Sequence, residues 1–270
     1  MSLVFENELY DMTETATEIL LENDLPWRVQ GDVVFEEVPY AGFRTDIVTA
    51  RFDTWACARR RLALDHLTPL PDERKYRRSY RTLQRLEPVT RAHWIHEDST
   101  YATEQTCREV WDWLVEHNYL TAIHEESLGG QQRLPLNDCD SQPIIDDHTP
   151  MVTVRYPDIL TIQAFELKPR DWETALRQAI RADSYADTRW VIMDAGAIGG
   201  ALEEQKQFHD SGVGLMSLDR NDIEIHVWAD SVHPPDGTTR QLLNERALAN
   251  VPQSVQAEID ERYQKLEEKR

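Results

Sequence analysis

Two side chains at the end of one apolar segment have the types and the spacing for metal-assisted hydrolysis. The segment Ile162–Trp172 reads IQAFELKPRDW, and in it Glu166 and Lys168 stand two residues apart. Side chains at positions i and i+2 of a β-strand lie on one face, so we expect these two to project together while Phe165 and Leu167 point into the core. A carboxylate can bind a metal that activates water, and a cation beside it can stabilise the charge that develops on a phosphodiester.

Lys168 is one of few lysines in a chain that otherwise uses arginine. The 29 basic residues comprise 24 Arg and five Lys, the latter at positions 75, 168, 206, 265 and 269. Lysine carries a compact ammonium whose pKa shifts readily with its surroundings, whereas arginine keeps its charge. A lysine retained beside Glu166 therefore indicates a chemical role for this side chain.

The composition is that of a folded acidic protein. The 270 residues are 40% hydrophobic and carry a formal net charge of −20, which argues against nucleic acid as a partner when taken alone. The acid excess is spread along the chain, however, and the eight Trp exclude a disordered polyanion. A diffuse acidic surface with scarce lysine is typical of proteins that stay dissolved in concentrated salt. We therefore expect a halophilic source, an archaeon or an archaeal virus.

Cysteine usage and hydropathy bear on the compartment. The three cysteines, Cys57, Cys107 and Cys139, are an odd and widely spaced set, which favours a reduced cytoplasm over a disulfide framework. No signal-like segment opens the sequence, and no apolar run approaches the ~20 residues of a membrane span. The nine His show no zinc-ligand spacing with these cysteines.

The charge is not uniform along the chain. Between Arg59 and Arg91 there are four acidic residues, Asp65, Asp72, Glu73 and Glu87. The basic residues of this segment are Arg59, Arg60, Arg61, Arg74, Lys75, Arg77, Arg78, Arg81, Arg85 and Arg91, which gives the segment a net charge of +6. This concentration predicts a phosphate-binding surface, and the alternative is a solvated helix face that pairs with acids elsewhere.

Hydrophobic periodicity predicts an α/β protein with a mixed sheet flanked by helices. We expect helices over residues 11–23, 172–186 and 198–208, and strands over 33–35, 45–52, 189–194, 212–218 and 223–228, with further core-like order in 151–169. The core would thus be discontinuous, with residues 1–55 and 151–235 forming it. Residues 56–150 would be a mainly helical insertion, and 236–270 a helical tail.

The insertion contains a pattern that is typical of a winged helix. Residues 97–120 predict a helix that starts at Ser99/Thr100 or at Thr103, and a strand-like segment and Gly129-Gly130 follow it. Such a module can place its helix in the major groove of DNA. Because this helix carries several acids, a lid or a protein-interaction subdomain is an equal alternative.

Three features together resemble the PD-(D/E)xK nuclease superfamily, which has the restriction-endonuclease-like fold. They are Asp46 at the start of one strand, Glu166-Leu167-Lys168 at the end of another, and a following helix that carries Gln178. The resemblance covers residues 11–55 and 160–230. It implies a metal-dependent deoxyribonuclease.

The resemblance also implies roles for individual residues. Asp46 and Glu166 would bind Mg²⁺ or Mn²⁺ with help from the Leu167 carbonyl, and Lys168 would position the attacking water or stabilise the phosphorane. Gln178 matches a glutamine of some members. Glu18 or Glu22 on the first helix could add a ligand, as in the archaeal resolvases.

Asp158 is a rival to Asp46 as the first carboxylate. Pro157-Asp158 supplies a literal Pro-Asp before Glu166, whereas Asp46 follows Thr45. Asp158 could reach Glu166 only through a hairpin in a segment without Gly or Asn, so Asp46 is favoured.

A second class of function competes with the nuclease. The same fold could serve a non-catalytic DNA-binding or regulatory protein, or an accessory factor whose C-terminal helix docks a partner. Convergence of Asp46 and Glu166 beside Lys168 would favour cleavage, and their separation or burial without access would favour binding. DNA versus RNA, endo- versus exonuclease, and the oligomeric state, a homodimer included, stay open.

Overall fold

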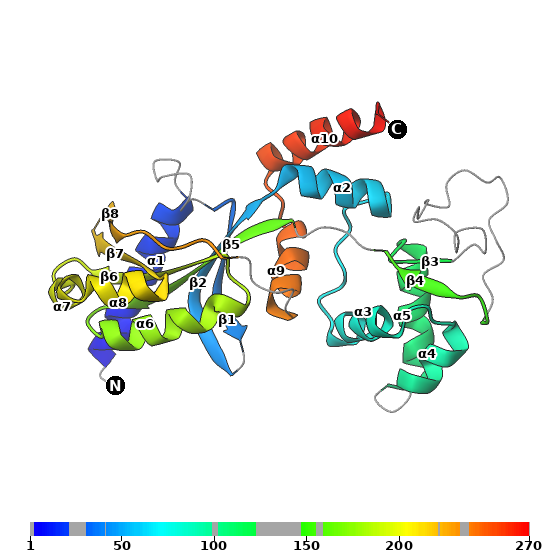
Figure 1. Cartoon of the computed structure of the whole chain (residues 1–270), viewed down its shortest axis with the longest axis horizontal. Helices are drawn as coiled ribbons and strands as arrows, with labels where there is room; N and C mark the ends of the chain where they lie inside the picture. The colour runs from blue at the N-terminus through cyan, green and yellow to red at the C-terminus, as the bar shows by residue number, and fades with distance from the viewer. Residues whose placement is uncertain are drawn as a thin grey trace. The chain divides into compact units, whose positions relative to one another are not determined.

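The computed structural model describes residues 3–21, 31–40, 42–98, 102–122, 147–154, 159–220, 222–232 and 238–269 (Figure 1). The chain divides into two compact units. The core unit comprises Met1–Asp53 and Ile159–Gln256, and the insertion unit comprises Thr54–Asp158 and Ala257–Arg270. Among the described residues, no helix combines the length and the apolar character needed to span a bilayer.

The core unit is built on a mixed six-stranded sheet, in agreement with the α/β class predicted from the sequence. Its strands, in spatial order, are β1 (Val33–Tyr40), β2 (Phe43–Phe52), β5 (Leu160–Lys168), β6 (Thr188–Asp194), β7 (Gly214–Asp219) and β8 (Asp222–Val227). The pairs β1–β2, β2–β5 and β7–β8 are antiparallel, whereas β5–β6 and β6–β7 are parallel. The parallel strands are nearly continuous apolar runs because helices cover both of their faces.

Two different sets of helices cover the two faces of this sheet. Helix α1 (Leu3–Leu21) packs Ala16 and Leu20 into a cluster that contains Phe165 and Leu167 of β5. Helices α6 (Trp172–Arg181), α7 (Gly199–Glu203) and α8 (Gln205–Ser211) pack on the face of Val191, Met193 and Leu215 (Figure 1). The helix predicted over 198–208 is therefore two short helices that meet at Glu204.

The connection from β5 to β6 fixes the end of β5. Parallel neighbours need a crossover, and α6 supplies it immediately after Lys168. The Asp171 carboxylate accepts a hydrogen bond from the Thr174 N–H at 3.0 Å and caps α6, which lowers the pKa of Asp171. A 3₁₀ turn, Ala182–Ser184, then leads to β6.

A buried ion pair holds the start of β5 to helix α9 (Thr238–Leu248). Arg240 lies 2.9 Å from Asp187, and both side chains are less than 10% exposed. Arg240 also donates to the Leu160 carbonyl, and Asp187 accepts from the Ile162 N–H at 2.7 Å. Every hydrogen bond of this set stabilises the strand that carries Glu166 and Lys168.

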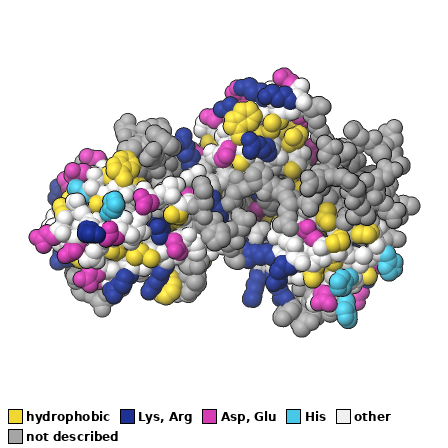
Figure 2. Space-filling view, viewed as in Figure 1, with side chains coloured by type: hydrophobic (Ala, Val, Ile, Leu, Met, Phe, Trp, Pro, Cys, Tyr) yellow, Lys and Arg dark blue, Asp and Glu magenta, His cyan; other side chains and the backbone are white. Residues whose placement is uncertain are grey.

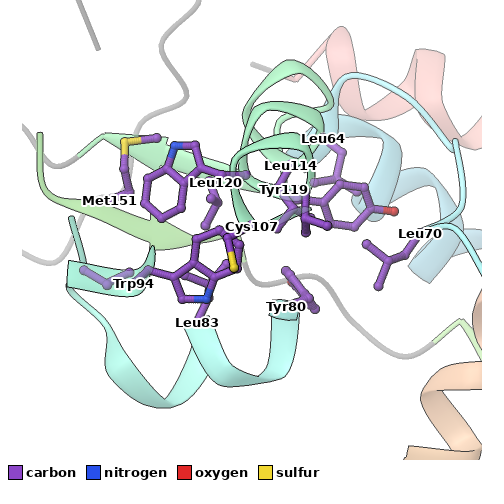
Figure 3. Packing of buried hydrophobic residues seen from close by; sticks show 13 residues of the cluster. Leu64, Leu70, Tyr80, Leu83, Trp94, Cys107, Leu114, Tyr119, Leu120 and Met151 are labelled. Atoms are coloured by element: carbon purple, nitrogen blue, oxygen red, sulfur yellow. The ribbon is translucent and has the colours of Figure 1, made fainter. Parts of the chain in front are cut away.

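The insertion unit has its own hydrophobic core. Its helices are α2 (Thr54–Leu64), α3 (Arg74–Leu86), α4 (Arg91–Asp98), α5 (Glu104–Glu116) and most of α10 (Gln253–Glu267). Figure 3 shows the packed side chains, among which Trp94 stacks on Trp111 at a centroid distance of 5.5 Å. Tyr80 meets Tyr119 edge-on at 5.5 Å. This aromatic core does not depend on the sheet of the core unit.

Several segments of the insertion unit differ from the sequence prediction or sharpen it. Thr103 caps α5 by accepting a hydrogen bond from the Thr106 N–H, whereas Ser99 and Thr100 lie outside the described residues. Strand β4 (Met151–Thr153) pairs with β3 (Leu120–Ala122) and not with the core sheet where we expected it. Gly129 and Gly130 are not described.

The predicted C-terminal tail is divided between the two units. Helix α9 belongs to the core unit, and most of α10 packs on α2 in the insertion unit. Arg61 pairs with Asp260 at 2.5 Å and lies over the ring of Tyr263 at 4.2 Å. The last helix is thus a packing element of the insertion unit.

Candidate functional site

The candidate site lies where β2 and β5 separate. Their described pairing ends at Ile47 and Phe165. Beyond that point, the Asp46 carboxylate accepts a hydrogen bond from the Leu167 N–H at 2.8 Å. The side chain thus satisfies a backbone donor that a continued ladder would have paired. As a result Asp46 lies directly beside the Glu166-Leu167-Lys168 segment.

Lys168 completes the contact with Asp46. Its Nζ lies 3.4 Å from Asp46 Oδ2 and donates to the Leu167 carbonyl at 3.0 Å. The side chains of Lys168 and Asp46 are 21% and 24% exposed, so solvent reaches both groups. The ammonium and the carboxylate that the sequence placed in different parts of the chain therefore converge.

Glu166 lies deeper than either of these groups. It is 2% exposed, and its Oε2 has no hydrogen-bond partner in the part of the chain that the structure describes. Burial, and after it the negative charge of Asp46, raises the pKa of Glu166 to about 8, while Lys168 acts in the opposite direction. Burial therefore favours the protonated form of this carboxyl group.

The register of β5 places Glu166 and Lys168 on one face. They pair with Val191 and Met193 of β6, which belong to the cluster under α6 and α8. Phe165 and Leu167 belong to the cluster under α1, as the alternation predicts. The shared face is as expected, but Glu166 is buried in it and Lys168 is only partly buried.

Thr45 and Tyr185 support the site, and sequence reasoning did not find them. The Thr45 hydroxyl lies 2.6 Å from the Tyr185 hydroxyl in a buried position. Hydrogen bonding by Thr45 also acts to lower the pKa of Glu166, although burial outweighs it. The two residues are 140 positions apart, and no local pattern links them.

The other candidate site residues from the sequence lie at various distances from this site or outside the described residues. Gln178 lies on α6, which covers the face of Glu166, and its Oε1 is buried without a hydrogen-bond partner among the described residues. Glu18 is exposed on α1, which covers the opposite face. Glu22 and Asp158 lie outside the described residues, so of the two rival carboxylates the structure places only Asp46.

The carboxylates of Asp46 and Glu166 are suited to a hard divalent cation. The structure describes no group of three or more His, Cys, Asp or Glu side chains that could hold a metal. A Mg²⁺ site does not require three such side chains, because Mg²⁺ is often held by one or two carboxylates and keeps several waters. The unpartnered Glu166 Oε2 and the repulsion between the two carboxylates are the features that a cation would relieve.

A second polar group in the core unit does not form a complete catalytic triad. Ser217 Oγ lies 2.8 Å from His226 Nε2, and Glu224 lies 4.0 Å from the other ring nitrogen. That last distance is beyond a hydrogen bond, so Glu224 does not orient the imidazole. Ser217 is also 95% buried, at 5% exposure.

Part of the basic segment 59–91 is structural. Arg60 is fully buried and donates to the Tyr119 hydroxyl at 2.9 Å. Arg91 pairs with Asp112 at 2.9 Å and with Asp147 at 3.5 Å. These two arginines have structural roles within the insertion unit. Most of the remaining basic residues of segment 59–91 lie on α3.

Comparisons with known proteins return no relative. No family model matches the sequence, and no curated protein or solved structure matches the chain. Function must therefore be inferred from the residues and their geometry.

Proposed function

We propose that the protein is a metal-dependent nuclease that hydrolyses DNA phosphodiester bonds. One observation carries the proposal: Asp46 accepts from the Leu167 N–H at 2.8 Å and lies 3.4 Å from Lys168 Nζ, beside Glu166. Two carboxylates and an ammonium in one place are the groups that metal-assisted phosphodiester hydrolysis uses.

In this proposal Asp46 and Glu166 hold Mg²⁺ or Mn²⁺. The bound cation would supply an activated water and stabilise charge on the phosphate oxygens. Glu166, whose pKa is raised to about 8, would have to lose its proton to serve as a ligand. Lys168, which is partly exposed, is placed to hold the scissile phosphate or the water and to balance the developing negative charge.

The arrangement of the core unit supports the restriction-endonuclease-like assignment. Helix α1, the antiparallel strands β1, β2 and β5, helix α6 and the parallel strand β6 follow one another in the core unit. This order, with Gln178 on α6, is the pattern on which the resemblance rests. The acidic composition supports the accompanying proposal of a halophilic, archaeal or archaeal-virus source and a cytoplasmic location.

The test is cleavage of duplex, single-stranded, flap and four-way-junction DNA in molar KCl, with Mg²⁺ or Mn²⁺. Lys168→Ala and Asp46→Ala should abolish metal-dependent cutting. The exposed ion pair of Lys206 and Asp210 on α8 offers matched controls, and Lys206→Ala and Asp210→Ala should cut like the wild type. Cutting that survives in Lys168→Ala and Asp46→Ala would overturn the assignment of the site.

A non-catalytic DNA-binding or regulatory protein is the second candidate. The burial of Glu166, at 2% exposure, favours it, because burial opposes the ionised form that a metal ligand requires. This candidate predicts DNA binding that is unaffected by divalent metal and no cutting of any substrate. The same assay therefore separates the two functions.

A further inference from the structure

Helix α3 carries a row of arginines on one side. It spans Arg74–Leu86 with the sequence RKYRRSYRTLQRL, which contains six basic residues and no acidic one in a chain whose net charge is −20. We call Arg74, Arg77, Arg78, Arg81 and Arg85 the α3 arginine stripe. Their spacing of i, i+3, i+4, i+7 and i+11 places all five on one face of the helix. Figure 2 shows basic side chains gathered over α3.

The opposite face of α3 is locked into the insertion unit. Ser79, Tyr80 and Leu83 are buried, and the Tyr80 hydroxyl donates to the Val154 carbonyl at 3.0 Å. Tyr76 meets Trp113 edge-on at 5.3 Å. Because these contacts fix the rotation of the helix about its axis, the α3 arginine stripe is held away from the core of the unit.

Two acids beside α3 form ion pairs with its first turn. Asp72 pairs with Arg77 at 2.6 Å, and Glu73 pairs with Lys75 at 3.2 Å. Arg74 and Arg85 are exposed, and neither forms an ion pair with a residue that the structure describes. Burial, together with the neighbouring charge of Arg77, lowers the pKa of Arg81. The stripe thus holds like charges close together, an arrangement that an anionic ligand would stabilise.

We propose that the α3 arginine stripe binds the phosphate backbone of double-stranded DNA without reading its sequence. From Arg74 to Arg85 the helix rises about 16 Å, at about 1.5 Å per residue. A duplex carries one phosphate charge for every ~1.7 Å of its axis when both strands are counted, so a basic helix of this length that lies against it meets several phosphates on the facing side. Guanidinium binds phosphate through paired hydrogen bonds.

The negative charge of the rest of the chain should restrict DNA binding to the α3 arginine stripe. A surface with an overall charge of −20 repels a polyanion, so DNA is attracted where the acids are absent. A partner with acidic side chains, such as a second copy of this chain, would present carboxylates without the regular spacing of a phosphate backbone. The inference rests on the proposed function for the identity of the ligand, but its test needs no cleavage.

The experiment measures binding of a fluorescent DNA duplex by anisotropy over a range of KCl concentrations, in EDTA so that nothing is cut. The stripe variant carries Arg74→Gln, Arg78→Gln and Arg85→Gln, which preserve helix propensity. The matched control carries Arg44→Gln, Arg108→Gln and Arg220→Gln, three arginines outside the stripe. The slope of log K against log[KCl] should fall by about 2 to 3 in the stripe variant, at about 0.9 for each lost contact, and stay unchanged in the control.

Several outcomes would overturn the inference. One is wild-type affinity and slope in the stripe variant, and another is an equal loss in the control. Stronger competition by single-stranded DNA or duplex RNA, or a change in oligomeric state without a change in DNA binding, would also overturn it. Circular dichroism checks folding, and the single variants Arg74→Glu and Arg85→Glu at the exposed ends repeat the test if the triple variant unfolds. The binding assay in EDTA needs no cutting, so loss of stripe binding with cleavage retained, or loss of cleavage with stripe binding retained, separates failure of the stripe from failure of the proposed function.

Discussion

Glu166 is deeply buried beside the carboxylate of Asp46, and both features raise its pKa. The stability of the protein should therefore depend on pH through this one side chain. Its pKa is raised from an ordinary 4.5 to about 8, so the folded state holds the proton more tightly than the unfolded state. As pH rises between these values, the unfolded chain ionises first and stability falls. The loss is complete above about pH 8, where the folded state ionises as well.

Replacing Glu166 with glutamine should remove this pH dependence. We expect Glu166→Gln and the wild type to have similar unfolding free energies near pH 5, where both side chains are neutral. Near pH 9 the variant should be more stable by on the order of 3 kcal/mol. Urea unfolding at the two pH values, at one KCl concentration, measures the difference. Parallel stability curves would show that Glu166 titrates normally.

Metal binding should release the proton of Glu166. Because a carboxylate ligand must be deprotonated, binding of Mg²⁺ or Mn²⁺ near pH 6.5 should release about one proton and become tighter as pH rises towards 8. Titration calorimetry in two buffers of different ionisation enthalpy counts the proton. Glu166→Gln should lose both effects, and binding without proton release would exclude Glu166 as a ligand.

Asp46 has a structural role that can be separated from its charge. Its carboxylate accepts from the Leu167 N–H, and the amide oxygen of Asp46→Asn can still accept, whereas Asp46→Ala cannot. At pH 6, where Glu166 keeps its proton, Asp46→Ala should be less stable than Asp46→Asn by ~1–3 kcal/mol. Both should lose metal binding. Equal stability of the two variants in urea unfolding would mean that this hydrogen bond contributes nothing.

At the scale of elements, local patterns predicted most of the core unit. Alternation and apolar runs located β2, β6, β7 and β8, because each strand is bounded by turns and packed on both faces. The split between α7 and α8 was missed, since Ala201 and Phe208 stand seven residues apart, which is the spacing of one face of a continuous helix. Residues 151–153 were expected to begin the core, but β4 pairs with β3, because a strand of three residues carries no information about its pairing partner.

The site itself could be predicted only in part. Glu166 and Lys168 are local, but Asp46 lies 121 positions from Leu167, and only the resemblance joined them. Periodicity did not predict that Glu166 would be almost fully buried, because alternation specifies a face and not its depth. Tyr185 comes after α6 in the chain, and its hydroxyl lies 2.6 Å from that of Thr45. No spacing in the sequence predicts this contact.

The ion pair of Asp187 and Arg240 should hold β5 in place. Both groups are buried, so Arg240→Met alone should cost ~3–5 kcal/mol by leaving Asp187 charged and unpaired. The double variant Asp187→Asn/Arg240→Met should recover part of this loss. Arg61 and Asp260, at 32% and 50% exposure, are the comparison pair, and Arg61→Met should cost less than ~1 kcal/mol beyond its packing on Tyr263. A similar cost for the two arginines in urea unfolding would contradict a special role for the buried pair.

At the scale of the whole molecule, salt acts on two properties in opposite directions. A formal charge of −20 repels itself in dilute salt, and added KCl screens this repulsion over ~10 Å at 0.1 M and ~3 Å at 1 M. The same KCl would weaken the proposed DNA binding, because each phosphate contact releases condensed counterions. We therefore expect high salt to stabilise the fold, whereas the proposed DNA binding by the α3 arginine stripe should be tightest in low salt.

Cleavage at subsaturating DNA should consequently pass through a maximum as KCl increases. Below the maximum the rate should follow the folded fraction, measured in parallel by thermal unfolding, and above it the rate should follow the DNA affinity. The stripe variant, with fewer phosphate contacts, should have a shallower decline on the high-salt side and the same rise on the low-salt side. At saturating DNA the decline should disappear in both proteins, because binding no longer limits the rate. A rate that falls steadily from the lowest salt, with the protein folded throughout, would show that the acidic surface does not limit stability and that its charge serves another purpose.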